Sequence, residues 1–130
     1  FFVSKHEVLV HNISPCEKAA QALAKAVPKI CVGKYRCKEF AASFEDILVR
    51  NNVKGKRLCI KSRTDFLHND DFGNVSTNGD HVATLVGEYV FDNLYPDGLP
   101  VSEWRAKFGL DEGHPGLRSW EEGMGTRGCL

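Results

Sequence analysis

Cys37, His81 and Asp92 are residue types that together suit nucleophilic catalysis by cysteine. Such catalysis needs a thiolate, a base beside it and a group that orients the base. Cys37 opens a predicted helix, where the positive end of the helix dipole favours a thiolate, and Arg36 and Lys38 add positive charge. The backbone N–H of Cys37 is a natural oxyanion donor, whereas the sequence identifies no side-chain donor.

A predicted β-hairpin relates His81 to Asp92. Two strand-like runs flank Gly87-Glu88, a two-residue turn of the Gly-X kind. Because side chains alternate along a strand, His81 and Asp92 share a face and are diagonal neighbours about 7–8 Å apart at the backbone. Asn93 points to the opposite face, so Asp92 is the preferred orienting group. A longer, bulged turn would reverse that choice.

Helical periodicity is clearest in the segment that begins at Cys37. Its apolar residues form one stripe: Cys37, Phe40, Ala41, Phe44, Ile47 and Leu48. The hairpin face that carries His81 also carries Leu85, Val90 and Leu94, so it is apolar enough to pack on this helix. We expect that packing to bring the imidazole to Cys37.

The remaining elements before the hairpin are shorter. Ser14 is a plausible N-cap, Glu17 completes a capping box, and Pro28 ends the helical run that follows. Residues 56–61 form a predicted strand, and residues 62–80 form a polar loop. The chain order therefore begins helix, helix, strand and hairpin.

The segment after the hairpin ends with a short predicted helix. Ser102 is a possible cap, and Trp104 and Phe108 fall on one side, where they suit a core. Trp104 and Asn93 are also the candidate substrate-binding residues. Residues 111–130 contain five glycines and predict an appendage with little core of its own. The fold class is α+β, with helices packed on a small antiparallel sheet.

The composition is that of one compact globular domain. The 130 residues carry 17 basic and 17 acidic side chains and are 42% hydrophobic, which excludes a disordered chain, a collagen-like repeat and a coiled coil. No apolar run approaches the roughly 20 residues needed to span a bilayer, so no membrane span is expected. The chain does not begin with Met, which suggests a domain cut from a longer protein.

We divide the domain into three parts and note a charge asymmetry between its halves. Residues 1–28 are predicted as a helical extension, 29–108 as the catalytic core and 109–130 as a C-terminal tail. Residues 29–63 hold ten basic and three acidic side chains, whereas 64–130 hold four and twelve. Such a split is usual for a soluble fold, or it provides a docking surface for a charged partner.

The five cysteines do not suggest a metal centre or a full set of disulfides. Their number is odd and no CxxC pair occurs, which argues against a zinc ribbon and favours a reducing compartment. One cysteine is then reactive and the others, including Cys59, are packing residues. The cluster from His68 to Asp71 lacks a calcium-loop spacing and is expected to be a solvated loop. We expect no metal and no cofactor.

An ordered set of short segments resembles the papain-fold toxin domains of bacterial polymorphic toxin systems, most closely the papain-fold toxin 2 group. The resemblance covers about residues 30–108. Its segments are Tyr35–Ala41, 52–57, 76–82, 90–94, 98–100 and Glu103-Trp104. It implies a papain-like or transglutaminase-like cysteine-hydrolase core with the chain order Cys, His, Asp or Asn, here Cys37, His81 and Asp92.

The resemblance also implies a biological setting. Such domains form the C-terminus of large secreted or surface-delivered effectors, enter the cytoplasm of a neighbouring bacterium, and are neutralised by a cognate immunity protein. Their reactions include peptide hydrolysis, glutamine deamidation and transglutamination, so a protein is the expected target. Two alternatives stay open: an RNA-cleaving toxin that uses the basic segment, and a non-catalytic binding module.

Overall fold

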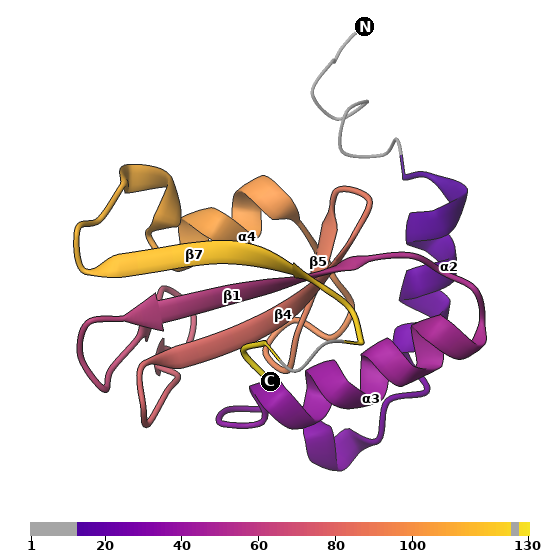
Figure 1. The fold of residues 1–130 in the computed structure, drawn as a ribbon, viewed down its shortest axis with the longest axis horizontal. Helices are drawn as coiled ribbons and strands as arrows, with labels where there is room; N and C mark the ends of the chain where they lie inside the picture. The colour runs from indigo at the N-terminus through magenta and orange to yellow at the C-terminus, as the bar shows by residue number, and fades with distance from the viewer. Residues whose placement is uncertain (1–12, 126–127) are drawn as a thin grey trace, which may run out of the picture.

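The computed structural model describes residues 13–125 and 128–130. Within these residues the protein is an α+β fold with three layers (Figure 1). A five-stranded sheet in the order β6-β5-β4-β1-β7 lies in the middle, and all of its strand pairs are antiparallel. The helices α2 and α3 cover one face of this sheet, and α4 covers the other.

The two longer helices begin where the sequence predicts. Helix α2 (Pro15–Ala24) has the expected capping box between Ser14 and Glu17, and α3 (Cys37–Arg50) starts at Cys37 itself. Helix α4 (Val101–Lys107) begins two residues earlier than predicted, because Pro100 is its N-cap residue and Ser102 lies inside it without capping it. The described residues also form two short 3₁₀ helices, η1 (Lys29–Cys31) and η2 (Leu110–Glu112).

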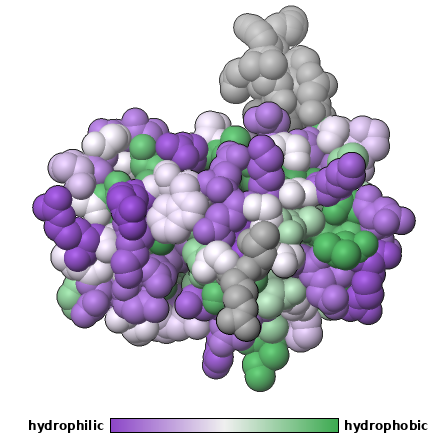
Figure 2. All heavy atoms as spheres, in the orientation of Figure 1, coloured by the Kyte–Doolittle hydropathy of each residue, from purple (hydrophilic) through white to green (hydrophobic). Residues whose placement is uncertain are grey.

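No helix in the described ranges combines the length and the apolar character that a bilayer crossing demands. On the face shown in Figure 2, the largest apolar groups lie at the right and at the bottom, over the α2 and α3 layer. Four of the exposed large apolar side chains come from this part of the chain: Ile30, Val32, Tyr35 and Val49.

The five-stranded sheet contains the predicted hairpin. The bounds of its strands are β1 Lys56–Ser62, β4 Asp80–Val86, β5 Tyr89–Phe91, β6 Leu99–Pro100 and β7 Leu117–Gly123. In the β4–β5 pair, Val86 lies opposite Tyr89 and Leu85 opposite Val90, as the Gly87-Glu88 turn predicts. Two further short strands, β2 (His68–Asn69) and β3 (Gly73–Asn74), pair with each other inside the predicted polar loop.

The sheet separates two hydrophobic cores, and their composition corrects one prediction. The face of β4 that carries His81 and Ala83 packs against Trp104 and Phe108 and so belongs to the core beneath α4. Helix α3 packs on the opposite face, where its aromatic stripe meets the side chains of Val86 and Phe91. The predicted packing of the His81 face on α3 is therefore wrong, because that face already has its apolar partners in α4.

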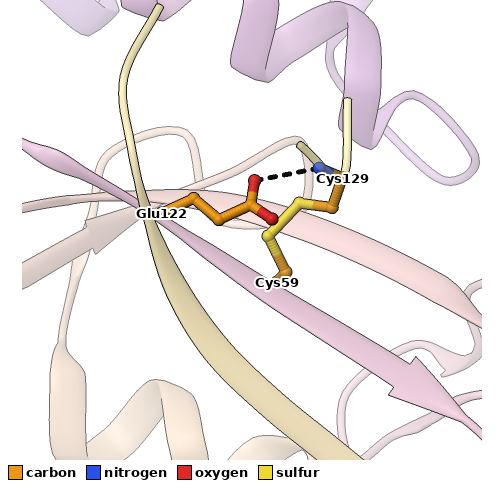
Figure 3. A group of neighbouring side chains, drawn as sticks. All are labelled: Cys59, Glu122 and Cys129. Atoms are coloured by element: carbon orange, nitrogen blue, oxygen red, sulfur yellow. Dashed lines mark hydrogen bonds between the residues drawn. A yellow bond between two sulfur atoms is a disulfide. The ribbon is translucent and has the colours of Figure 1, made fainter. Parts of the chain in front are cut away.

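The C-terminal segment also departs from the prediction of an appendage. Strand β7 pairs with β1 along seven positions, from Lys56 opposite Gly123 to Ser62 opposite Leu117. Beyond β7, the Cys129 sulfur forms a disulfide with Cys59 of β1 (Figure 3). Cys59 is therefore not the unpaired packing cysteine that the sequence predicted. The odd number of cysteines no longer favours a reducing compartment, since disulfides persist in oxidising ones.

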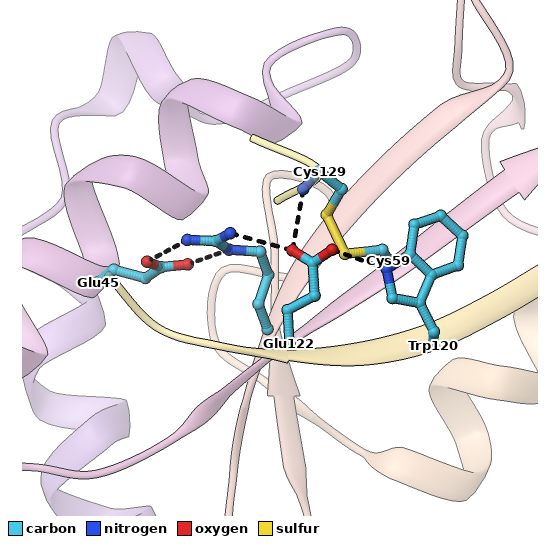
Figure 4. Close-up of a disulfide and its surroundings, with 6 residues drawn as sticks. Glu45, Cys59, Trp120, Glu122 and Cys129 are labelled. Carbon is cyan, nitrogen blue, oxygen red and sulfur yellow. Dashed lines mark hydrogen bonds and ion pairs between the residues drawn. A yellow bond between two sulfur atoms is a disulfide. The ribbon is translucent and has the colours of Figure 1, made fainter. Parts of the chain in front are cut away.

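A buried ion pair links this C-terminal segment to α3. The guanidinium of Arg57 in β1 donates to both carboxylate oxygens of Glu45 at 2.7 and 2.8 Å, and to Glu122 of β7 at 3.2 Å. In Figure 4 the carboxylates of Glu45 and Glu122 point toward each other, and the dashed lines between them mark these hydrogen bonds. Glu122 also accepts the Cys129 N–H at 2.9 Å. The ion pairs of Arg57 and the disulfide together hold the C-terminal segment against the sheet.

Candidate active site

Helix α3 places Cys37 at its first residue. Arg36 occupies the N-cap position, and its carbonyl accepts the first intrahelical hydrogen bond, from the N–H of Phe40 at 2.9 Å. The N–H groups of the first turn therefore point out of the helix, where they favour negative charge. Cys37 is half-buried, and its thiol is not part of a disulfide. The Cys37 thiol and these backbone N–H donors therefore lie at the same end of α3.

Strand β4 places His81 at its second residue, in an apolar setting. The His81 side chain is fully buried, and its ring lies 4.9 Å from the ring of Phe108 and 6.2 Å from that of Trp104, measured between centroids. Its Nε2 lies 2.8 Å from Oδ2 of Asp92. The other ring nitrogen, Nδ1, is buried and makes no hydrogen bond within the described part of the chain.

The Asp92 carboxylate is held by four groups. Besides His81, its Oδ2 accepts the indole N–H of Trp104 at 2.9 Å. Its Oδ1 accepts the backbone N–H groups of Leu94 at 2.9 Å and Tyr95 at 2.8 Å. With both oxygens satisfied, Asp92 is fixed in place and in turn fixes the plane of the imidazole.

Asn93 faces the other way, as the hairpin register predicts. Its side-chain Nδ2 donates to the Gly33 carbonyl at 2.7 Å, and its main-chain carbonyl accepts the Gly33 N–H at 2.8 Å. Asn93 therefore ties the loop that precedes Cys37 to the hairpin that carries Asp92. Asp92, and not Asn93, contacts the imidazole in this structure.

The environment of His81 favours its protonated form. Burial by itself lowers the pKa of this imidazole, but the hydrogen bond with Asp92, the nearby Cys37 sulfur and the negative charge of both groups raise the pKa to about 9. Cys37 thus interacts with a ring whose Nε2 is already committed to Asp92. That leaves Nδ1 as the nitrogen available to the thiol or to a substrate atom.

The thiol opens onto a hollow of about 270 Å³ between the start of α3 and the loop before β4. The lining residues are Tyr35, Cys37, Lys38, Glu39, Val75, Ser76, Thr77, Asn78 and Asp80. His81 and Asp92 are out of contact with solvent and do not line this hollow. Of the three candidate residues Cys37 alone lines it, so a reacting carbonyl in the hollow would meet the sulfur directly.

A comparison with known protein families found a match. A family model described as papain fold toxin 2 matches residues 18–109, which is more than half of the chain. The chain belongs to the papain fold toxin 2 family. No curated protein and no solved structure matches the chain.

The papain-fold assignment covers all three residues of the candidate triad, because the match runs from α2 to just past α4. Papain-fold domains usually use a cysteine nucleophile, and the protein is a toxin domain of this fold. The match stops before β7, so the disulfide and the contacts of Glu122 lie partly outside it. Strand β7 and Cys129 thus follow the matched residues.

Trp104 was a candidate substrate-binding residue, but the structure gives its side chain a different position. It is 1% exposed and packs under the sheet, with its indole nitrogen on Asp92. A buried indole N–H needs an acceptor, and that need, together with the carboxylate of Asp92, is the signal that could have revealed this contact. In this toxin domain Trp104 contacts the acid and not the hollow.

Within the described residues, one group of potential metal ligands is close enough to share an ion: Cys59, Glu122 and Cys129. Both sulfurs are consumed by the disulfide, and both carboxylate oxygens already accept hydrogen bonds, so this group does not fit a metal (Figure 3). In the cluster from His68 to Asp71, the titratable side chains are exposed, but Asn69 is buried and accepts the backbone N–H of Asp71.

Proposed function

We propose that the protein is a cysteine-dependent acyl-transfer enzyme in which Cys37 is the nucleophile, His81 the base and acid, and Asp92 the orienting group. One observation supports this most strongly. Fully buried His81 binds Asp92 through Nε2 and keeps Nδ1 without a partner, while Cys37 is one of the groups that raise its pKa. A purely structural histidine would have both ring nitrogens satisfied.

The proposed reaction follows from these positions. The Cys37 thiolate attacks a carbonyl in the hollow, and the helix-start N–H groups stabilise the oxyanion. Protonated His81 gives its Nδ1 proton to the leaving amine, and the C–N bond breaks to leave an acyl–thiol intermediate. Water or a second amine then attacks the thioester, His81 takes up the proton of this nucleophile, and the sulfur–carbon bond breaks to release the Cys37 thiolate for another cycle.

The proposed substrate is a protein of the recipient bacterium. We infer that the domain is delivered as the C-terminus of a larger effector, acts in the target-cell cytoplasm and is held inactive by a cognate immunity protein. Peptide hydrolysis, glutamine deamidation and transglutamination all pass through the same intermediate. They differ only in which amine leaves and which nucleophile arrives.

Expression without an immunity protein tests the proposal. We expect wild-type protein to arrest growth and Cys37→Ala to restore it, whereas Cys31→Ala, a matched half-buried free cysteine, leaves toxicity intact. Mass spectrometry of the recipient's proteins separates the reactions, since deamidation of a glutamine adds about one mass unit and proteolysis creates new termini. Full toxicity of Cys37→Ala would rule the proposal out.

An RNA-cleaving toxin is the second candidate, and one observation favours it. The exposed side chains of Lys29, Lys34 and Lys38 lie in the segment that leads to the hollow, where they suit phosphate contacts. Cleavage of cellular RNA that depends on these lysines, with no change in the recipient's proteins, would favour this candidate over acyl transfer.

A further inference from the structure

Tyr35, two residues before the nucleophile, has an unusual backbone conformation. Among the described residues, Tyr35 (φ 67°) and Asn52 (φ 58°) are the non-glycine residues with positive φ. Asn52 has a local explanation, because it follows the end of α3, where Val53 donates back to the Leu48 carbonyl. Tyr35 lies in the turn that precedes α3, and there its bulky side chain makes the left-handed region costly, whereas a glycine would not.

Packing does not account for the presence of a tyrosine at this position. Tyr35 is 50% exposed, and its hydroxyl makes one long hydrogen bond, to the Asn74 carbonyl at 3.5 Å. A glycine would adopt the same φ without strain. The contacts of the ring therefore stabilise the fold too little to offset the strain of the Tyr35 backbone. Backbone strain of this type is concentrated at functional sites.

The location of the ring suggests what it is required for. Tyr35 and Cys37 line the same hollow, and Val75 lines it from the loop opposite. The Tyr35 hydroxyl reaches the carbonyl of Asn74, the residue before Val75, so the ring borders the hollow between its two sides. The volume of about 270 Å³ lies below the roughly 300–1,000 Å³ of drug-sized sites and suits a single side chain.

We propose that Tyr35 is a specificity residue whose ring packs against an apolar group on the acyl part of the substrate, next to the carbonyl that Cys37 attacks. The inference rests on the proposed function. It narrows the substrate class to acyl donors with an apolar or aromatic side chain at the reacting residue or beside it. An aromatic face accepts such a group with little loss of freedom, because the strained backbone already fixes the ring.

Paired alkylating reagents test the proposal without knowledge of the natural substrate. Iodoacetamide and iodoacetanilide react with a thiolate in the same way: a sulfur–carbon bond forms, iodide leaves, and His81 keeps its proton. They differ by one phenyl ring. Peptide mapping of the folded protein gives the rate of each reagent at Cys37, with Cys31 as an internal control in the same sample.

We expect the anilide-to-amide rate ratio at Cys37 to exceed the ratio at Cys31 by about fivefold, the size of one aromatic contact. Tyr35→Ala should bring the Cys37 ratio down to that of Cys31, and Tyr35→Phe should keep it. Tyr35→Gly removes the ring without backbone strain, so it repeats the test should the alanine variant fold poorly. Phe66→Ala, which removes a similarly exposed aromatic ring outside the hollow, should change nothing.

An unchanged ratio in both Tyr35→Ala and Tyr35→Gly would overturn the proposal, as would a wild-type ratio equal to that of Cys31. These outcomes are distinct from failure of the proposed function. That failure would appear as toxicity that survives Cys37→Ala, whatever the ratios at Tyr35.

Discussion

The indole nitrogen of Trp104 donates to the same carboxylate oxygen of Asp92 that faces His81, at 2.9 Å. A side chain of helix α4 thereby contacts Asp92, the carboxylate that binds the imidazole. The catalytic proposal depends on this contact, because an acid shared by two donors cannot rotate away from one without losing the other. In the proposed reaction Trp104 acts only through Asp92, because it does not line the hollow.

The first prediction concerns Trp104→Phe, which keeps an aromatic ring and removes the N–H. Loss of a buried hydrogen bond to a charged group should lower the free energy of unfolding by about 1.5–3 kcal/mol. Trp120→Phe is the matched control, since the Trp120 N–H donates to Glu122 at 2.8 Å on the exposed surface. Urea denaturation should show a much smaller change for the control. Equal losses in the two variants would contradict the role given to the buried contact.

The second prediction concerns pH. Folding raises the pKa of His81 from 6.5 to about 9, so the protonated ring stabilises the folded state. This stabilisation is fully present below about pH 6.5 and is lost as the pH rises through 9, by about 3 kcal/mol in total. Asp92→Asn removes the charge that supports the protonated ring and should flatten this dependence. Denaturation curves between pH 6 and 10 measure it. A wild-type stability that rises over this range would argue against the ion pair.

The third prediction concerns the buried pair of Glu45 and Arg57. Glu45→Gln removes the bidentate carboxylate from a buried guanidinium that keeps its contact with Glu122, and should cost about 1.5–3 kcal/mol, as expected for a hydrogen bond to a charged group. The adjacent Asp46 provides the control, because its pair with Arg50 is exposed at 2.6 Å. Asp46→Asn should cost about 0.5 kcal/mol or less. Thermal unfolding of both variants gives the comparison. Similar shifts of the midpoint temperature would show that burial does not increase the contribution of the pair to stability.

The fourth prediction concerns the disulfide between Cys59 and Cys129, which are 70 residues apart in the sequence. Under the chain-entropy model, a closed loop of this length stabilises the fold by about 4 kcal/mol. A reductant should lower the midpoint of denaturation of the wild type and leave Cys129→Ser unchanged. Three thiols should react in the denatured oxidised protein and five after reduction. Five reactive thiols before reduction would show that the bond does not form.

The sequence was sufficient for the hairpin and insufficient for the layers around it. The Gly87-Glu88 turn and the alternation of side chains specify a register, and that register alone puts His81 on the same face as Asp92 and diagonal to it. Which helix covers which face is a different question. Both α3 and α4 present apolar stripes, and only the full set of contacts shows that Trp104 takes the face assigned to α3.

Long-range contacts of the C-terminal segment were also beyond the sequence. Strand β7 is mostly exposed, so it lacks the alternation of buried and exposed residues that marks a half-buried strand. The pairing of Cys59 with Cys129 is set by the path of the chain after β7, and spacing alone does not specify it. The positive φ of Tyr35 was likewise beyond sequence-based prediction, since only the folded backbone reveals it.

The most direct test of the central claim is the alkylation rate of Cys37 at pH 6, where ordinary thiols are almost fully protonated. A thiol paired with protonated His81 should react with iodoacetamide at least about tenfold faster than Cys31 in the same protein. His81→Ala should remove the difference. Equal rates at Cys37 and Cys31 in the folded wild type would contradict the account.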